Sequence, residues 1–154
     1  MAHKHERTGA RRAAAQVLYS ASIRGVSASE LLESNLMDCL EAPLSDYSLK
    51  LIEGVEGNAS QIDAIITDAA KNWTLDRMPV MDVVITRIAL FEMLHVDDVP
   101  VSVSINEAVE LAKRFGGEDD SPKFVNGMLG SVARHMEVEE ATVAADVPVV
   151  VPAS

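Results

Sequence analysis

The chain has 154 residues, of which 48% are hydrophobic, and this length and composition predict one folded domain. It has a single cysteine, Cys39, no apolar run of about 18 residues, and an N-terminus without the apolar segment of a secretory signal. These features exclude an internal disulfide and a membrane-spanning helix, and they predict a cytoplasmic protein.

The charge is unevenly distributed along the chain. The net charge is −11, yet residues 1–24 hold five of the 13 cationic side chains and one acidic residue, Glu6. An acidic body repels nucleic acid on average, so a basic N-terminal end on it has to act locally. A solvated basic tail is the simpler interpretation of this pattern.

Apolar spacing in the first half of the chain predicts three helices. The first runs from about residue 8 to 23 and ends at Gly25, and a short second one spans about 29–40. A third starts at Ser45 or Asp46 and reaches Asn72. Two glycines weaken it and the sequence SQID at 60–63 offers a separate start, but we expect one long helix.

The second half predicts three more helices. Residues 79–94 are apolar nearly all round, which is typical of a central helix packed on several sides. The next helix is expected from Ser104, whose spacing to Glu107 is that of a capping box, to a stop at Gly116. The last helix spans about 122–136.

We therefore expect an all-α fold of six or seven helices, with a domain over residues 1–138 and a flexible tail over 139–154. Only two stretches, 99–105 and 147–152, are rich in β-forming residues. Both contain proline, which argues against strands.

Enzyme signatures are absent from the sequence. It contains no GxxxxGK[ST] phosphate loop, no GxGxxG dinucleotide motif and no GxSxG nucleophile elbow. His3 and His5 lack a third metal ligand, and the acidic residues 118–120 are expected to form a solvated loop. We expect no catalytic activity, no cofactor and no metal.

The first helix carries the clearest functional pattern. Arg12 and Tyr19 are seven residues apart and share one line of the helix, away from its apolar stripe, with Arg11 beside that line and Arg7 one turn before Arg11. Guanidinium groups pair with phosphates and a tyrosine ring can stack an unpaired base, so the pattern suggests single-stranded RNA. An ordinary basic helix start with a packed tyrosine remains the alternative.

Four segments of the sequence resemble the NusB family of transcription antitermination factors. They are RRAAAQVLYS (11–20), TRIALFEML (86–94), VPVSVSINEAVELAKRFG (99–116) and KFVNGMLG (123–130), in the family's order within about residues 7–134. The resemblance implies two small helical bundles and a long third helix. It also implies binding of boxA RNA together with the ribosomal protein NusE, within an RNA polymerase complex that reads through terminators on ribosomal RNA operons.

The resemblance also implies functional residues. The RNA-binding residues it implies are Arg7, Arg11, Arg12, Tyr19, Lys123, Phe124, Asn126 and Gly127. It places Asp82 on the outer side of its helix, facing NusE. Because the two RNA-binding segments would form the walls of one site, they are expected to lie next to each other in the fold. A protein-interaction module or homodimer with weak RNA binding is the alternative function.

Overall fold

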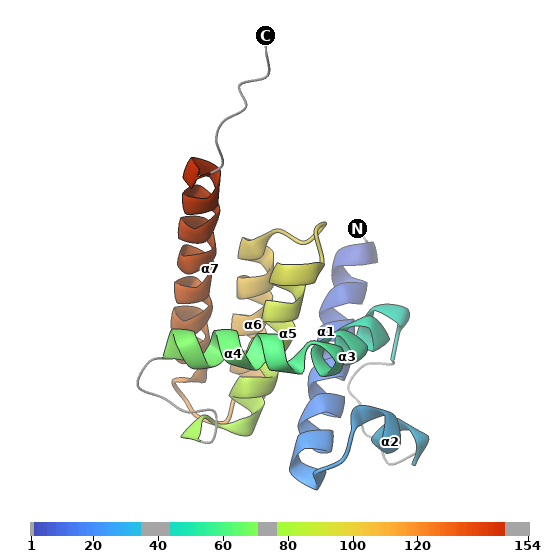
Figure 1. The fold of residues 1–154 in the computed structure, drawn as a ribbon. Helices are drawn as coiled ribbons and strands as arrows, with labels where there is room; N and C mark the ends of the chain where they lie inside the picture. The colour runs from blue at the N-terminus through green and yellow to red at the C-terminus, as the bar shows by residue number, and fades with distance from the viewer. Residues whose placement is uncertain (1, 35–43, 71–76, 147–154) are drawn as a thin grey trace.

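The computed structural model describes residues 2–34, 44–70 and 77–146, with side chains between residues 6 and 136. These ranges contain helices and no strand, as predicted. The helices, drawn in Figure 1, are α1 (Ala2–Arg24), α2 (Ala28–Glu33), α3 (Asp46–Gly57), α4 (Ala59–Ala70), α5 (Val80–His95), α6 (Val101–Phe115) and α7 (Ser121–Asp146).

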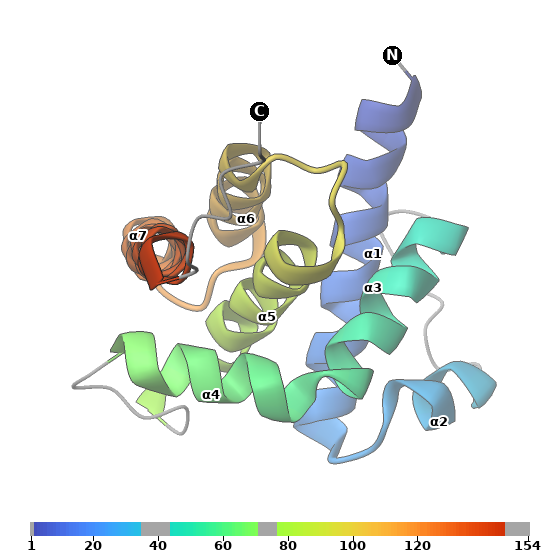
Figure 2. The same ribbon diagram turned by 45° about the horizontal axis from the view of Figure 1, so that its top comes forward.

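The helices form two groups joined by α5. Helices α2 and α3 pack against α1, whereas α4, α6 and α7 pack with α5 (Figure 2). Helix α5 also packs against α1 and α3, and it is buried along most of its length. The expectation of a central apolar helix over about 79–94 is confirmed, with Pro79 immediately before it.

Small residues let α1 approach its neighbours closely. The predicted stripe of Ala10, Ala14, Val17, Leu18 and Ala21 is buried. Gly25 follows the helix with φ of 68°, a left-handed backbone conformation that glycine adopts without steric cost. The predicted end of this helix is confirmed, while its start lies earlier than Thr8, at Ala2.

The prediction of one long third helix is wrong, because α3 and α4 meet at Asn58. The backbone there has φ of −118° and ψ of 20°, and the Asn58 side-chain amide donates to the Gly54 carbonyl oxygen at 2.8 Å. The break lets α3 follow α1 and α5 while α4 turns to reach α7. The predicted helix ends at Leu40 and Asn72 lie outside the described residues.

Helix α6 begins earlier than its capping-box pattern suggested. Its first residue is Val101, preceded by Pro100, so the β-rich stretch 99–105 is mostly helical. Proline fixes a φ suited to a helix start, which outweighs the β preference of the valines. Ser104 is buried inside the helix, and its hydroxyl has no hydrogen-bond partner among the described residues.

Helix α7 extends past the predicted end near Met136 to Asp146. The added residues are rich in Glu and Ala, which favour helix. The division of the chain at residue 138 stays a prediction, and residues 147–154 lie outside the described part of the chain.

Gly54 is required for the close approach of α3 to α5. A Cβ atom there would lie 2.2 Å from the Cε1 and Cζ atoms of the Phe91 ring, whereas one at Gly57 would meet nothing within 4 Å. We expect Gly54→Ala to lower the free energy of unfolding by about 1–3 kcal/mol, the usual cost of overpacking a core. Urea unfolding followed by circular dichroism measures the change.

Gly57→Ala is the matched control. It should leave the free energy of unfolding unchanged or raise it by up to about 1 kcal/mol, because alanine favours helix over glycine. Equal effects of the two substitutions would contradict the contact between Gly54 and Phe91.

Candidate functional site

Arg11 is buried in the interior of the protein. Its guanidinium forms a two-pronged ion pair with Glu92, with Nη2 2.8 Å and Nε 3.0 Å from Oε2, and the two side chains are 3% and 1% exposed. The expectation that Arg11 flanks an exposed RNA-binding line is therefore wrong. Its side chain turns into the core because a carboxylate on α5 is placed to receive it.

Two further side chains join this ion pair. The Tyr47 hydroxyl donates to Glu92 from α3, and Glu107 of α6 lies 3.5 Å from Nη1 of Arg11. Burial and the nearby Glu92 carboxylate raise the pKa of the Tyr47 phenol. Burial alone would lower the pKa of Arg11, but its hydrogen bond and proximity to Glu92 raise it, so the guanidinium stays charged.

Arg7 lies at the edge of the same cluster. Its Nη2 donates to Asp98 Oδ2 at 3.0 Å, and its guanidinium carbon lies 4.5 Å from the centre of the Tyr47 ring. The hydrogen bond from Arg7 lowers the pKa of Asp98. Arg7 is 30% exposed, so part of its side chain remains accessible.

Arg12 and Tyr19 occupy the accessible side of α1. Tyr19 is 37% exposed, so it is not packed beneath a neighbouring helix. Arg12 is half-buried in a pocket of about 270 Å³ between α1 and α6, and Lys113 and Arg114 are the other cations lining it. Neither α6 cation is among the residues predicted to bind RNA.

The four predicted residues of α7 divide between two surfaces. Lys123, Phe124 and Gly127 line a groove of about 450 Å³ against the end of α4. Asn126 lies on the same side of α7 as Pro122, four residues earlier, which faces the end of α6.

The α1 and α7 segments do not form one pocket, which corrects the expectation of adjacent walls. Helices α5 and α6 stand between them (Figure 2). The connection runs over α6, because Lys113 lines both the pocket that holds Arg12 and the hollow beside Pro122.

Asp82 is buried, so the expectation that it faces outward is wrong. Its Oδ2 accepts a hydrogen bond of 2.9 Å from the Ser121 hydroxyl, whose oxygen in turn accepts from the Glu118 amide at 3.0 Å. Its Oδ1 has no partner among the described residues. Burial raises the pKa of Asp82 despite that hydrogen bond. Asp82 therefore fastens the start of α7 to α5.

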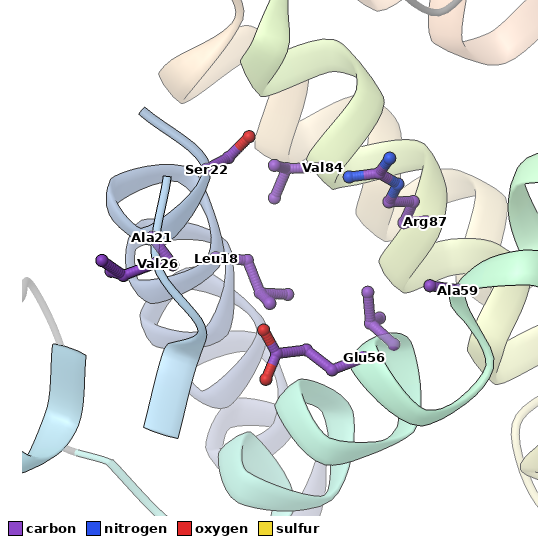
Figure 3. Close-up of a pocket in the computed structure, with 9 residues that line it drawn as sticks. Leu18, Ala21, Ser22, Val26, Glu56, Ala59, Val84 and Arg87 are labelled. Carbon is purple, nitrogen blue, oxygen red and sulfur yellow. The ribbon is translucent and has the colours of Figure 1, made fainter. Parts of the chain in front are cut away.

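A further pocket, of about 250 Å³, lies among α1, α3, α4 and α5 (Figure 3). Its charged groups already have partners, because Glu56 accepts from the Ala28 amide at 3.0 Å and Arg87 pairs with Asp63 at 2.8 Å. The ion pair of Arg87 and Asp63 is partly exposed, with the two side chains 26% and 29% exposed.

A metal-binding cluster and a membrane-spanning helix are both absent from the described part of the chain. It has no group of three or more His, Cys, Asp or Glu side chains arranged to hold a metal ion. None of its helices is both long and apolar enough to cross a membrane.

The pKa of Asp82 is higher in the folded protein than in the unfolded chain. Its contribution to the free energy of unfolding is therefore fully present below the pKa of the unfolded chain, and it is lost as pH rises through the pKa of the folded protein. Asp82→Asn cannot ionise and keeps an acceptor for Ser121. We expect this variant to gain stability relative to the parent as pH rises from acidic to neutral, measured by urea unfolding.

Asp98→Asn is the control, and its stability is expected to change with pH in the opposite direction. The lowered pKa of Asp98 means that its contribution is present above the unfolded pKa and is lost as pH falls. This variant should lose stability relative to the parent as pH rises. A difference between Asp82→Asn and the parent that does not vary with pH would contradict the burial of an ionisable carboxyl group.

Comparison with known proteins relates the chain to one family. The model of the NusB family matches residues 8–134. A transcription antitermination protein NusB from Saccharopolyspora erythraea is 44% identical over 128 residues, covering 82% of this chain and 86% of that protein. A second protein of the same name, from Streptomyces avermitilis, is 42% identical over 128 residues, which cover 80% of this chain and 88% of that protein.

Solved structures show the same fold. A T. maritima NusB structure matches with a TM-score of 0.72 and 33% identity, and the match covers 83% of this chain and 90% of the T. maritima chain. The fold also matches a chain in a complex of NusB and NusE with double-stranded RNA, with a TM-score of 0.71 and 24% identity over 84% of this chain and 96% of that one. The matched family model, these identities and the shared fold together establish that the chain belongs to the NusB family.

Proposed function

We propose that the protein is a transcription antitermination factor that binds boxA-like single-stranded RNA together with the ribosomal protein NusE. In this role it would act within an RNA polymerase complex and promote readthrough on ribosomal RNA operons. Family membership supports the general role, as does the name of its relatives, transcription antitermination protein. A chain of the same fold has been solved with NusE and RNA.

One observation carries the RNA part of the proposal. Arg12 and the exposed ring of Tyr19 lie on one line of α1, on a protein whose net charge is −11. A guanidinium beside an accessible aromatic ring can hold a phosphate while the ring stacks a base. Arg7 is a further proposed contact, partly exposed beside Asp98 at the edge of the Arg11 cluster rather than on the line of Arg12 and Tyr19. Arg11 supports the site from inside.

The start of α7 is the second proposed RNA contact. Lys123 and the exposed backbone of Gly127 border the groove against α4, with Phe124 at its edge, and Asn126 faces the α6 side. An RNA strand touching both α1 and α7 has to cross the end of α6. Asp82 contributes by holding the start of α7 in place, and the structure gives it no exposed surface for NusE.

Direct binding tests the function. The measurement is fluorescence anisotropy of a labelled boxA-like single strand, with and without NusE, beside a double-stranded RNA of matched length. We expect single-strand binding that NusE strengthens and that salt weakens, because phosphate contacts release counterions. No binding to the single strand even with NusE would refute the proposal.

The rival function, a protein-interaction module or homodimer, predicts a different result. Sedimentation would then show a protein assembly whose mass RNA does not change. A one-to-one complex with RNA and NusE would exclude that rival.

Tyr19→Ala separates base stacking from charge. Loss of a stacked base costs about 1–3 kcal/mol, so RNA affinity should fall roughly 5- to 150-fold while the salt dependence stays the same. Leu49→Ala on α3 is the control, because Leu49 is exposed to a similar degree, 38% against 37%. Equal losses of affinity in both variants would show that Tyr19 makes no specific contact.

Gly127→Ala separates folding from binding on α7. A Cβ atom at this position would meet nothing within 4 Å, so alanine should stabilise the helix by about 0.5–1 kcal/mol. RNA affinity should nevertheless fall if the strand approaches the backbone closely. Thermal unfolding and RNA anisotropy on the same sample measure both effects, and unchanged affinity would remove Gly127 from the site.

A further inference from the structure

One cation in the pocket between α1 and α6, Arg12, is not bonded to either of the carboxylates that line the pocket. Among the described residues, Arg12 has neither a hydrogen bond nor an ion pair, although its side chain is half-buried. Partial burial of a charge without a partner is unfavourable. By contrast, the neighbouring residue Arg11 has a complete ion pair.

The acidic residues of the pocket already have partners. Glu107 accepts from the Thr8 hydroxyl at 2.9 Å and lies 3.5 Å from Arg11. Glu110 accepts from Lys113 at 3.0 Å, in an exposed pair that contributes little stability. Neither carboxylate is engaged with Arg12, so the pocket can accept an anion from outside.

We propose that this pocket, formed by Arg12, Lys113 and Arg114, binds a backbone phosphate of the RNA. The inference rests on the proposed function and assigns α6 a direct part in it. Arginine forks suit phosphate oxygens, and lysine adds a mobile point charge. Tyr19 lies on the same line of α1, so one strand can place a phosphate in the pocket and a base on the ring.

The position of Lys113 and Arg114 at the end of α6 has a simpler explanation, but it does not account for Arg12. Cations in the last turn of a helix interact favourably with its dipole. That explanation does not apply to Arg12, which lies in the first half of α1 and faces the same pocket. The convergence of the three cations from two helices is what favours a bound anion.

The salt dependence of RNA binding tests the proposal. Binding of the boxA-like strand with NusE is measured from about 50 to 200 mM salt for the parent, Arg12→Gln and Arg114→Gln. Each glutamine variant should bind more weakly and lower the slope of log affinity against log salt by about 0.7, the loss of one single-strand phosphate contact. Arg12→Lys should keep most of the slope.

Lys50→Gln is the matched control. It removes one positive charge from an exposed position on α3, and α3 and α6 lie on different sides of α5 (Figure 2). Its slope should equal that of the parent. If Arg12→Gln unfolds, Arg114→Gln still decides the question, because Arg114 is exposed on the helix surface.

The outcomes separate this inference from the function on which it rests. If the parent binds RNA and both glutamine variants keep its slope, the phosphate pocket is refuted and the function stands. If the parent does not bind RNA even with NusE, the function fails and the pocket assignment fails with it. If inorganic phosphate raises the thermal stability of the parent but not of Arg12→Gln, while the RNA slopes agree, the pocket binds free anions instead.

Discussion

The buried ion pair between Arg11 and Glu92 is the constraint on which the arrangement of the helices depends. A guanidinium and a carboxylate taken out of water together are tolerated only when both are well hydrogen-bonded. The pair satisfies this requirement by drawing in Tyr47 and Glu107, so four helices, α1, α3, α5 and α6, meet at one polar cluster. Removing one partner would leave a buried charge unpaired, at a cost of about 3–5 kcal/mol. The ion pair and the buried apolar stripe of α1 together fix the orientation of this helix about its axis.

That orientation determines what α1 presents to its surroundings. Successive residues of an α-helix are turned by about 100°, so fixing Arg11 toward Glu92 directs Arg12 to the seam with α6. Tyr19 follows two turns later on the same line and remains exposed. The buried pair thus positions a surface that it does not touch. The same division of roles appears at α7, where the buried Asp82 and Ser121 fasten the helix start and leave its outer residues accessible.

The sequence predicted the class of fold well because it depends on spacing that a single chain displays. The sequence itself displays the small-residue stripe of α1, the apolar character of α5 and the glycine after α1. The resemblance to the NusB family implied the bundle arrangement. Helical spacing indicated the burial of Arg11, which lies three residues before Ala14 and seven before Leu18 on the buried stripe. Its ion pair was not predictable, because Glu92 is 81 residues away in the sequence. The prediction that Asp82 faces outward was wrong for a related reason, since its partner Ser121 comes from a distant helix. Local signals for the break at Asn58 were present, in two glycines and the separate start offered by SQID at 60–63. The packing of α4 against α7, which outweighed the apolar spacing of one continuous helix, was not visible in them.

The separation of the α1 and α7 surfaces changes how an acidic protein can hold RNA. Surface charges are screened beyond about 8–10 Å at physiological salt, so the overall charge matters less than the groups directly beneath the strand. Between α1 and α7 those groups belong to the end of α6, where Lys113 borders both hollows. Glu118, Asp119 and Asp120 follow immediately in the loop before α7 and oppose a phosphate placed there. In the RNA complex proposed above, a strand held by Arg12 and continuing toward Asn126 would follow a short basic path beside an acidic loop, and this arrangement would favour one route across the surface over non-specific contact.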